Sequence, residues 1–145
     1  MNKDIAREWV TALRSGEYPQ GMGGLRQYGD LIRSEVTYCC LGVLCDVVAE
    51  RTFMAVNPGA YGGYYDTESD PAIYHPFNNL LPPRVRKFAG TPNDDILITL
   101  TSAERETFGR GEESTGVEYL ANLNDSGKFS FADIADMIER TFDLA

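Results

Sequence analysis

The stretch YCCLGVLCDVVAE, residues 38–50, predicts the central helix of the fold. Apolar and sulfur-bearing residues cover nearly its whole circumference: Cys40, Leu41, Val43, Leu44, Cys45, Val47 and Val48. A helix that is apolar nearly all round is a buried one. The charged residues Asp46, Glu50 and Arg51 then return the chain to water. We therefore expect a buried core helix against which the terminal segments pack.

Two amphipathic helices are predicted to flank this core helix. The first spans residues 3–15, with Asn2 as its N-cap and Gly16 as its stop. Its apolar positions recur at helical spacing: Ile5, Trp9, Ala12 and Leu13. The last helix begins after Ser130, which forms a capping box with Asp133 three residues later. Its core-facing stripe is Phe131, Ile134, Ala135, Ile138 and Phe142.

Shorter elements are expected before the last helix. Residues 17–30 contain five glycines and prolines and predict a loop. Residues 31–36 predict a short extended segment. Residues 81–90 predict a short helix with proline near its start and glycine at its end. Its buried side would be Val85, Phe88 and Ala89. Residues 96–100 (ILITL) are rich in β-branched side chains and predict a strand.

The last third of the chain contains two further helix-start signals. Thr101 and Glu104 form a capping box that opens a short helix. Thr115 and Glu118 offer a second, for a helix covering Val117, Leu120, Ala121 and Leu123; a strand is the alternative. Residues 124–127 predict a turn. With no clear linker, residues 1–145 are expected to form a single globular α+β domain, helix-rich, with the buried central helix, two flanking amphipathic helices and a small sheet or hairpin.

The charge of the chain limits its partners. The net charge is −9, and residues 101–145 carry 4 basic and 10 acidic residues, which is −6 of that total. Such a surface repels a phosphate backbone, so direct nucleic-acid binding is not expected. An acidic face can instead compete with nucleic acid for a nucleic-acid-binding protein. The chain contains no apolar run long enough for a membrane span and no signal-peptide region, so we expect a cytoplasmic protein that does not bind membranes.

The residue types that usually carry catalysis or metal binding are sparse. Cys39, Cys40 and Cys45 have no CxxC spacing, which argues against a structural zinc site and favours buried thiols in a reducing compartment. His75 is the only histidine, and a Cys–His pair would require the buried helix to present a thiol beside it. A hydrolase with two catalytic carboxylates that are distant in the sequence stays an alternative, but the sequence singles out no such pair. We expect a non-enzymatic protein without metal or cofactor.

A glycine-rich loop with tyrosines is the first candidate for ligand binding. Residues 57–71 (NPGAYGGYYDTESDP) carry Tyr61, Tyr64 and Tyr65 on an open backbone. Tyrosines in such a setting offer flat faces for stacking and hydroxyls for hydrogen bonds. The alternative is that they only cover the edge of the domain or form a hairpin around Gly62 and Gly63.

Cations and one polar turn complete the candidate ligand-binding residues. Arg26 lies among the glycines of the first loop, and Arg84 belongs to a compact basic cluster with Arg86 and Lys87. Either could meet an anion, although a basic cluster is usually a solvated face. In the predicted turn, Asn124 and Asp125 could read the edge of a heterocycle with Lys128 nearby; alternatively they bond their own backbone.

Four motifs resemble those of a family of small proteins encoded by bacteriophages and prophages. They are ALxSGxYxQ at residues 12–20, GxL at 23–25, YCCLGVLCD at 38–46, and an end segment with LND at 123–125, SF at 130–131 and IA at 134–135. The resemblance implies an accessory factor that acts on the host. Small phage proteins of this kind include antagonists of nucleotide-signalled immunity, some of which are sponges for a cyclic nucleotide or an ADP-ribose derivative.

Two functions follow as hypotheses. The first is a non-enzymatic sponge that captures a nucleotide-derived immune signal, with tyrosines for stacking, Arg26 or the Arg84–Lys87 cluster for phosphate, and Asn124 and Asp125 for the base edge. The second is an acidic interaction module that inhibits a host nucleic-acid-binding protein. Both place the protein in the host cytosol, and both leave a homo-oligomer open.

Overall fold

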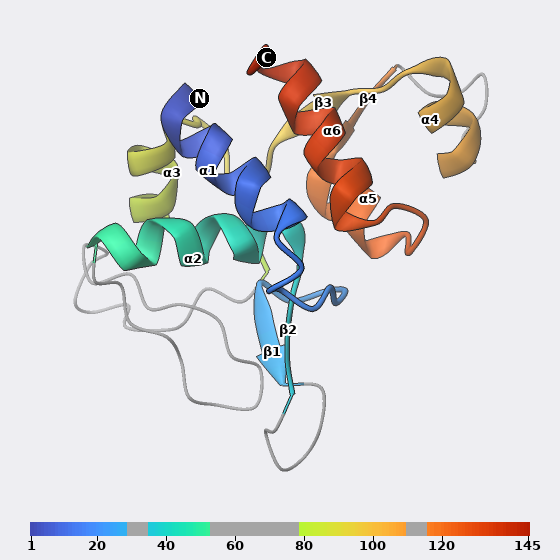
Figure 1. Cartoon of the computed structure of the whole chain (residues 1–145). Helices are drawn as coiled ribbons and strands as arrows, with labels where there is room; N and C mark the ends of the chain where they lie inside the picture. The colour runs from blue at the N-terminus through green and yellow to red at the C-terminus, as the bar shows by residue number, and fades with distance from the viewer. Residues whose placement is uncertain (29–34, 53–78, 110–115) are drawn as a thin grey trace.

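The described part of the chain, residues 1–28, 35–52, 79–109 and 116–145, forms six helices and four short strands in a computed structural model (Figure 1). The helices are α1 (Lys3–Arg14), α2 (Cys40–Thr52), α3 (Pro83–Ala89), α4 (Ser102–Phe108), α5 (Leu120–Asp125) and α6 (Phe131–Thr141). The strands are β1 (Arg26–Tyr28), β2 (Val36–Tyr38), β3 (Leu97–Thr99) and β4 (Val117–Tyr119). This arrangement confirms the prediction of a helix-rich α+β fold.

Helix α2 is the buried helix that its sequence predicts. Its apolar side chains are almost completely shielded from solvent: Cys40, Leu41, Val43, Leu44, Cys45, Val47 and Val48. It packs against α1, α3, α5 and β2, so it contacts elements from most of the described chain. Helix α3, which ends at the left-handed Gly90, is confirmed with Val85 and Ala89 buried. Phe88 of α3 is 39% exposed, so its predicted burial is wrong.

Helix α1 lies between α2 and α6 (Figure 1). Trp9 of α1 is fully buried, and its indole Nε1 donates to the carbonyl oxygen of Cys40 at 2.9 Å. Helix α6 packs mainly on α1 and on β3, so the expectation that both terminal helices pack on α2 is right chiefly for α1. The N-cap of α1 at Asn2 and the capping box of Ser130 and Asp133 on α6 are both confirmed.

Two antiparallel ribbons complete the fold. In the first, β1 pairs with β2, and Arg26 faces Tyr38 across the ladder. The prediction of a continuous loop over 17–30 is therefore wrong at Arg26–Tyr28. The sequence predicts Tyr38 at the start of the central helix, but its backbone N–H donates to Pro19 O at 2.9 Å and its carbonyl accepts from Gly21 N at 2.8 Å. These bonds hold it in an extended conformation.

The second ribbon pairs β3 with β4 and corrects two predictions. Val117 lies opposite Thr99, so this segment is a strand and the helix begins only at Leu120. The predicted capping role of Glu118 is wrong, because it lies in β4. The predicted turn at 124–127 begins too early, since α5 runs to Asp125 and the chain reverses at Gly127, which has φ of 69°. The strand in 96–100 and the capping box of α4 are confirmed.

None of the helices within the described ranges has the length and apolar content needed to cross a membrane.

Candidate functional site

The side chain of Asn124 joins three separate parts of the chain. Its Oδ1 accepts hydrogen bonds from the backbone N–H of Cys40 and from Gln20 Nε2, both at 3.2 Å. Its Nδ2 donates to Gly21 O at 2.8 Å and to Asp125 Oδ1 at 3.2 Å. An amide offers two donor hydrogens and two acceptor lone pairs, so all four positions are occupied. Asn124 is also fully buried, which leaves no amide edge for a ligand.

Asp125 and Gln20 extend the same junction. Asp125 Oδ1 also accepts from the backbone N–H of Gly23 at 2.9 Å, and Gln20 Nε2 also donates to Phe129 O at 3.0 Å. These bonds fasten the glycine-rich segment to the end of α5 and to the start of α2. We therefore assign Asn124 and Asp125 a structural role. Gln20 was missed as their partner, although it closes the ALxSGxYxQ motif.

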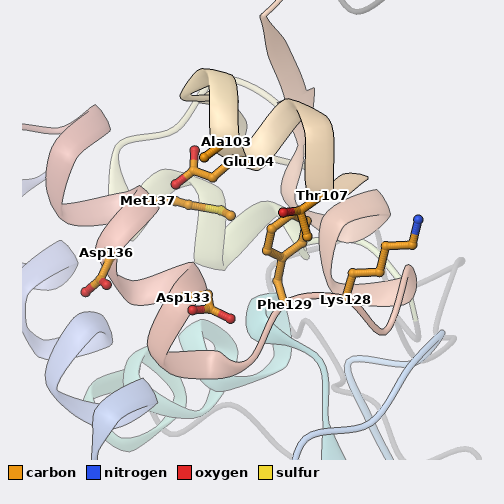
Figure 2. Close-up of a pocket in the computed structure, with 8 residues that line it drawn as sticks. All are labelled: Ala103, Glu104, Thr107, Lys128, Phe129, Asp133, Asp136 and Met137. Carbon is orange, nitrogen blue, oxygen red and sulfur yellow. The ribbon is translucent and has the colours of Figure 1, made fainter. Parts of the chain in front are cut away.

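Lys128 lies outside this junction, beside a separate hollow of about 220 Å³ (Figure 2). Its Nζ donates to the carbonyl oxygen of Phe108 at 3.2 Å. The hollow lies between α4, α6 and the segment that precedes α6, and its lining residues are Ala103, Glu104, Thr107, Lys128, Phe129, Asp133, Asp136 and Met137.

The carboxylates of this hollow already have partners within the protein. Glu104 binds Arg140 at 2.7 Å, and Asp136 binds Arg14 at 2.6 Å. Asp133 accepts from the backbone N–H of Ser130, at 2.9 Å, as part of the cap of α6. A ligand would have to compete with these bonds. The hollow is therefore a weak candidate for a binding site.

Arg26 is held by aromatic neighbours on the first ribbon. Its guanidinium carbon lies 5.2 Å from the centroid of the Tyr28 ring, within cation–π range. Burial acts to lower the pKa of Arg26, but hydrogen bonds with Tyr28 and Tyr38 outweigh it and raise the pKa above its ordinary value. Arg84 lies half-buried on α3. Tyr61, Tyr64, Tyr65 and the only histidine, His75, lie outside the described residues.

Of the eight predicted site residues, five lie in the described parts of the chain, and these five are divided among different partners and different elements. Asn124 and Asp125 bond to each other, and Lys128 lies a few residues on with a different partner. Arg26 and Arg84 lie on separate elements, β1 and α3.

A groove between α1 and α2 is larger than the hollow beside Lys128, with a volume of about 540 Å³. Its lining residues are Arg7, Glu8, Thr11, Ala12, Ser15, Glu17, Tyr18, Val47 and Glu50. The Tyr18 hydroxyl donates to Asp46 Oδ2 at 2.5 Å, and its ring meets that of Tyr38 edge-on with centroids 4.9 Å apart. Burial and the bond to Asp46 raise the pKa of Tyr18, so it remains a neutral phenol. Sequence reasoning missed this groove.

The outer face of the β3–β4 ribbon carries an unusual set of side chains. Ile98 and Glu118 point inward and are buried. The opposite face exposes three large apolar side chains: Leu97 at 46%, Tyr119 at 43% and Val117 at 37%. Leu97 lies directly across from Tyr119 in the ladder. We call Leu97, Val117 and Tyr119 the ribbon face.

Comparison with known proteins gives a family. Residues 1–142 match the family model described as a domain of unknown function (DUF8296). The chain belongs to the DUF8296 family. Neither the curated proteins nor the solved structures contain a match. The description of DUF8296 assigns no activity, so the function of this member must be argued from its residues, and its resemblance to phage proteins stays a prediction.

The three thiols of this DUF8296 member are buried, as the sequence predicts. Burial raises the pKa of Cys39 to about 11 and raises the pKa of Cys40 and Cys45 well above the ordinary value. The thiolate is the reactive form of cysteine, and these thiols stay protonated at neutral pH. Their environment is that of core residues.

Raised thiol pKa values predict an alkaline loss of stability. Unfolded thiols ionise near pH 8.5 to 9, whereas Cys39 in the folded protein ionises near 11, so the folded state holds its proton more tightly. The free energy of unfolding should be unaffected by this group below about pH 8. Above that, each thiol should lower it by up to about 1.4 kcal/mol per pH unit. Urea unfolding from pH 7 to 10 measures this slope. A Cys39→Ala variant should show a shallower slope, and an unchanged slope would contradict the assignment.

Proposed function

We propose that this protein is a phage accessory protein that acts without catalysis, as an interaction module for a basic, nucleic-acid-binding protein of the host. The observation that carries the proposal is the ribbon face. In a two-stranded ribbon with one buried side, the outer side is normally polar. Here Leu97 and Tyr119 form an exposed cross-strand pair, with Val117 beside them.

The composition of the ribbon face suits a protein partner. Aromatic and large aliphatic side chains supply most of the binding energy in protein interfaces, and tyrosine is among the most frequent anchors. The pair is held on paired strands, so little conformational entropy is lost when a partner covers it. None of these three side chains carries a positive charge that could bind a phosphate.

The charge of the chain argues that the partner is basic. The net charge is −9, and a second copy of the chain would carry the same charge and be repelled. Several cations already form surface ion pairs within the chain: Arg14 with Asp136 and Glu139, and Arg140 with Glu104. A protein that binds nucleic acid presents a basic surface, which this acidic chain attracts.

The proposal predicts that two substitutions on the ribbon face abolish partner capture. The double variant Leu97→Ser with Tyr119→Ser should capture a basic host protein about ten-fold less than the wild type does, or less still. The reason is that truncating an anchor residue weakens binding by about 1–2 kcal/mol or more. Both side chains are exposed, so the fold should survive. Quantitative mass spectrometry of proteins captured on immobilised protein measures the difference.

Phe88→Ser is the matched control for this experiment. Phe88 is also apolar and 39% exposed, but it lies on α3. The control should capture the same basic protein as the wild type. Equal capture by the ribbon-face double variant, or the absence of any specifically retained basic protein, would overturn the proposal.

A nucleotide sponge is the second candidate, and one observation favours it. Arg26 stacked over Tyr28 combines a cation with an aromatic face, which is the pairing that recognises a phosphate and a base. Saturating cyclic dinucleotide or ADP-ribose should then raise the melting temperature, because ligand binding stabilises the folded state. Arg26→Ala should remove that rise. No rise with the wild type would discard this candidate and leave the interaction module standing.

A further inference from the structure

We infer that the groove between α1 and α2 binds a lysine or arginine side chain of an extended basic polypeptide. The groove shares no residue with the ribbon face, so this site does not rest on the proposed function. Its walls combine an apolar floor with two carboxylates, Glu17 and Glu50, that have no ion pair among the described residues. Both features are needed to bind a side chain that has a hydrocarbon stem and a charged end.

The floor of the groove is apolar and well supported. Val47 of α2 is 9% exposed, and Ala12 of α1 packs against the core. The Tyr18 ring forms one wall, and its two contacts fix it from both ends, through the hydroxyl to Asp46 and through the ring edge to Tyr38. A long aliphatic stem can lie along this surface while its charged end remains near water.

The charges lining the groove do not balance. Arg7 is bound by Asp4 at 3.1 Å, and Glu8 is bound by Arg51. Within the described chain, Glu17 and Glu50 have neither an ion pair nor a side-chain hydrogen bond, and both are exposed. Two negative charges therefore remain on the rim. They attract a cation and repel a phosphate, so the groove selects against nucleotides.

The size of the groove favours a polypeptide over a single small cation. The groove is open to solvent, and its volume of about 540 Å³ is larger than a single small cation needs. It lies along α1 from Arg7 to Ser15 and therefore extends over about two helical turns. An extended chain with alternating basic residues can place one side chain on the floor and its neighbours over the rim.

The test uses a fluorescent octapeptide of alternating glycine and arginine, with fluorescence anisotropy at low ionic strength. The wild type should bind it, and the variant Glu17→Gln with Glu50→Gln should bind about five- to ten-fold more weakly, the loss expected for two partly solvated ion pairs. Chemical shifts of the Thr11 and Ser15 amides should move on titration. Thermal unfolding of the variant checks that the fold is unchanged.

The matched control neutralises two carboxylates elsewhere, Asp94→Asn with Glu106→Gln. It has the same net charge as the test variant, and both residues are exposed and absent from the groove lining. Its affinity should remain within about two-fold of wild type. Equal losses in both variants would show attraction by the overall charge only, and no binding by the wild type would remove the site; either result overturns the inference. If spermine binds more tightly than the peptide and moves the same amide chemical shifts, the ligand is a polyamine, and the assignment of a polypeptide ligand is overturned.

Discussion

Replacing Gly42 by alanine is expected to destabilise the folded protein severely. Gly42 lies in the buried helix α2, where its Cα faces the backbone of Leu25. A Cβ at this position would overlap the carbonyl group of Leu25, far inside van der Waals contact. The obstacle is backbone, so no side-chain rotation can relieve it. We expect a loss of more than about 4 kcal/mol in the free energy of unfolding, measured by urea denaturation.

Helix propensity gives the opposite sign for the same substitution, which makes the test sharp. Alanine in a helix interior normally stabilises by about 0.5–1 kcal/mol relative to glycine. Gly16→Ala is the matched control, since a Cβ there meets nothing within 4 Å and only its φ of 77° opposes the change. We expect a loss of about 1–2 kcal/mol for Gly16→Ala. A Gly42→Ala protein that unfolds at or above the wild-type urea concentration would contradict the packing described here.

Replacing Asn124 by alanine is expected to cost about 3–5 kcal/mol. The substitution leaves the buried N–H of Cys40 and the carbonyl of Gly21 without their side-chain partner. Each unsatisfied buried polar group costs about 1–3 kcal/mol, and the lost volume adds to this. The measurement is again the free energy of unfolding in urea.

Asn122→Ala provides the control within the same helix. Asn122 is exposed, and its amide makes one hydrogen bond, to Glu118 Oε1 at 2.9 Å. Its removal should cost about 1 kcal/mol or less. Equal effects of the two substitutions would mean that the buried junction is not held by Asn124. A nucleotide that stabilises the wild type but not Asn124→Ala, with both proteins folded, would restore Asn124 as a ligand residue.

Local signals in the sequence predicted most helices correctly. The capping boxes that begin at Thr101 and Ser130 each bring donor and acceptor within three residues, so the pattern alone contains the interaction. Gly90 ends α3 by the same kind of local chemistry. Burial of α2 follows from its all-round apolar surface, and this too requires no knowledge of a partner.

Strand β1 was missed and β4 was given only as the alternative to a helix, because three residues carry no periodic signal. Arg26–Tyr28 is extended only because Val36–Tyr38 pairs with it, and Val117 because Thr99 lies across from it. In each case the tertiary partner outweighs the local pattern. A capping signal before Val117 was therefore misleading.

The candidate sites depend on contacts between distant residues. Asn124 bonds to Gln20 and Cys40, which lie 104 and 84 residues away in the sequence. Its polar character suggested a binding site, whereas its partners make it part of the core. The α1–α2 groove was missed for the same reason, because Glu17 and Glu50 become neighbours of one cavity only after the helices pack.

The packing of α6 on α1 has a consequence for how the protein is made. Arg14 binds Glu139, a residue 125 positions later, so α1 can pack on α6 only after α6 has been translated. Until then the side of α1 that packs on α6 is uncovered, although α2 can already cover the side that carries Trp9. Such surfaces are recognised by chaperones and favour aggregation. We expect ribosome-bound intermediates that lack α6 to depend on a chaperone such as trigger factor to prevent aggregation. Chains that include α6 should be released from it.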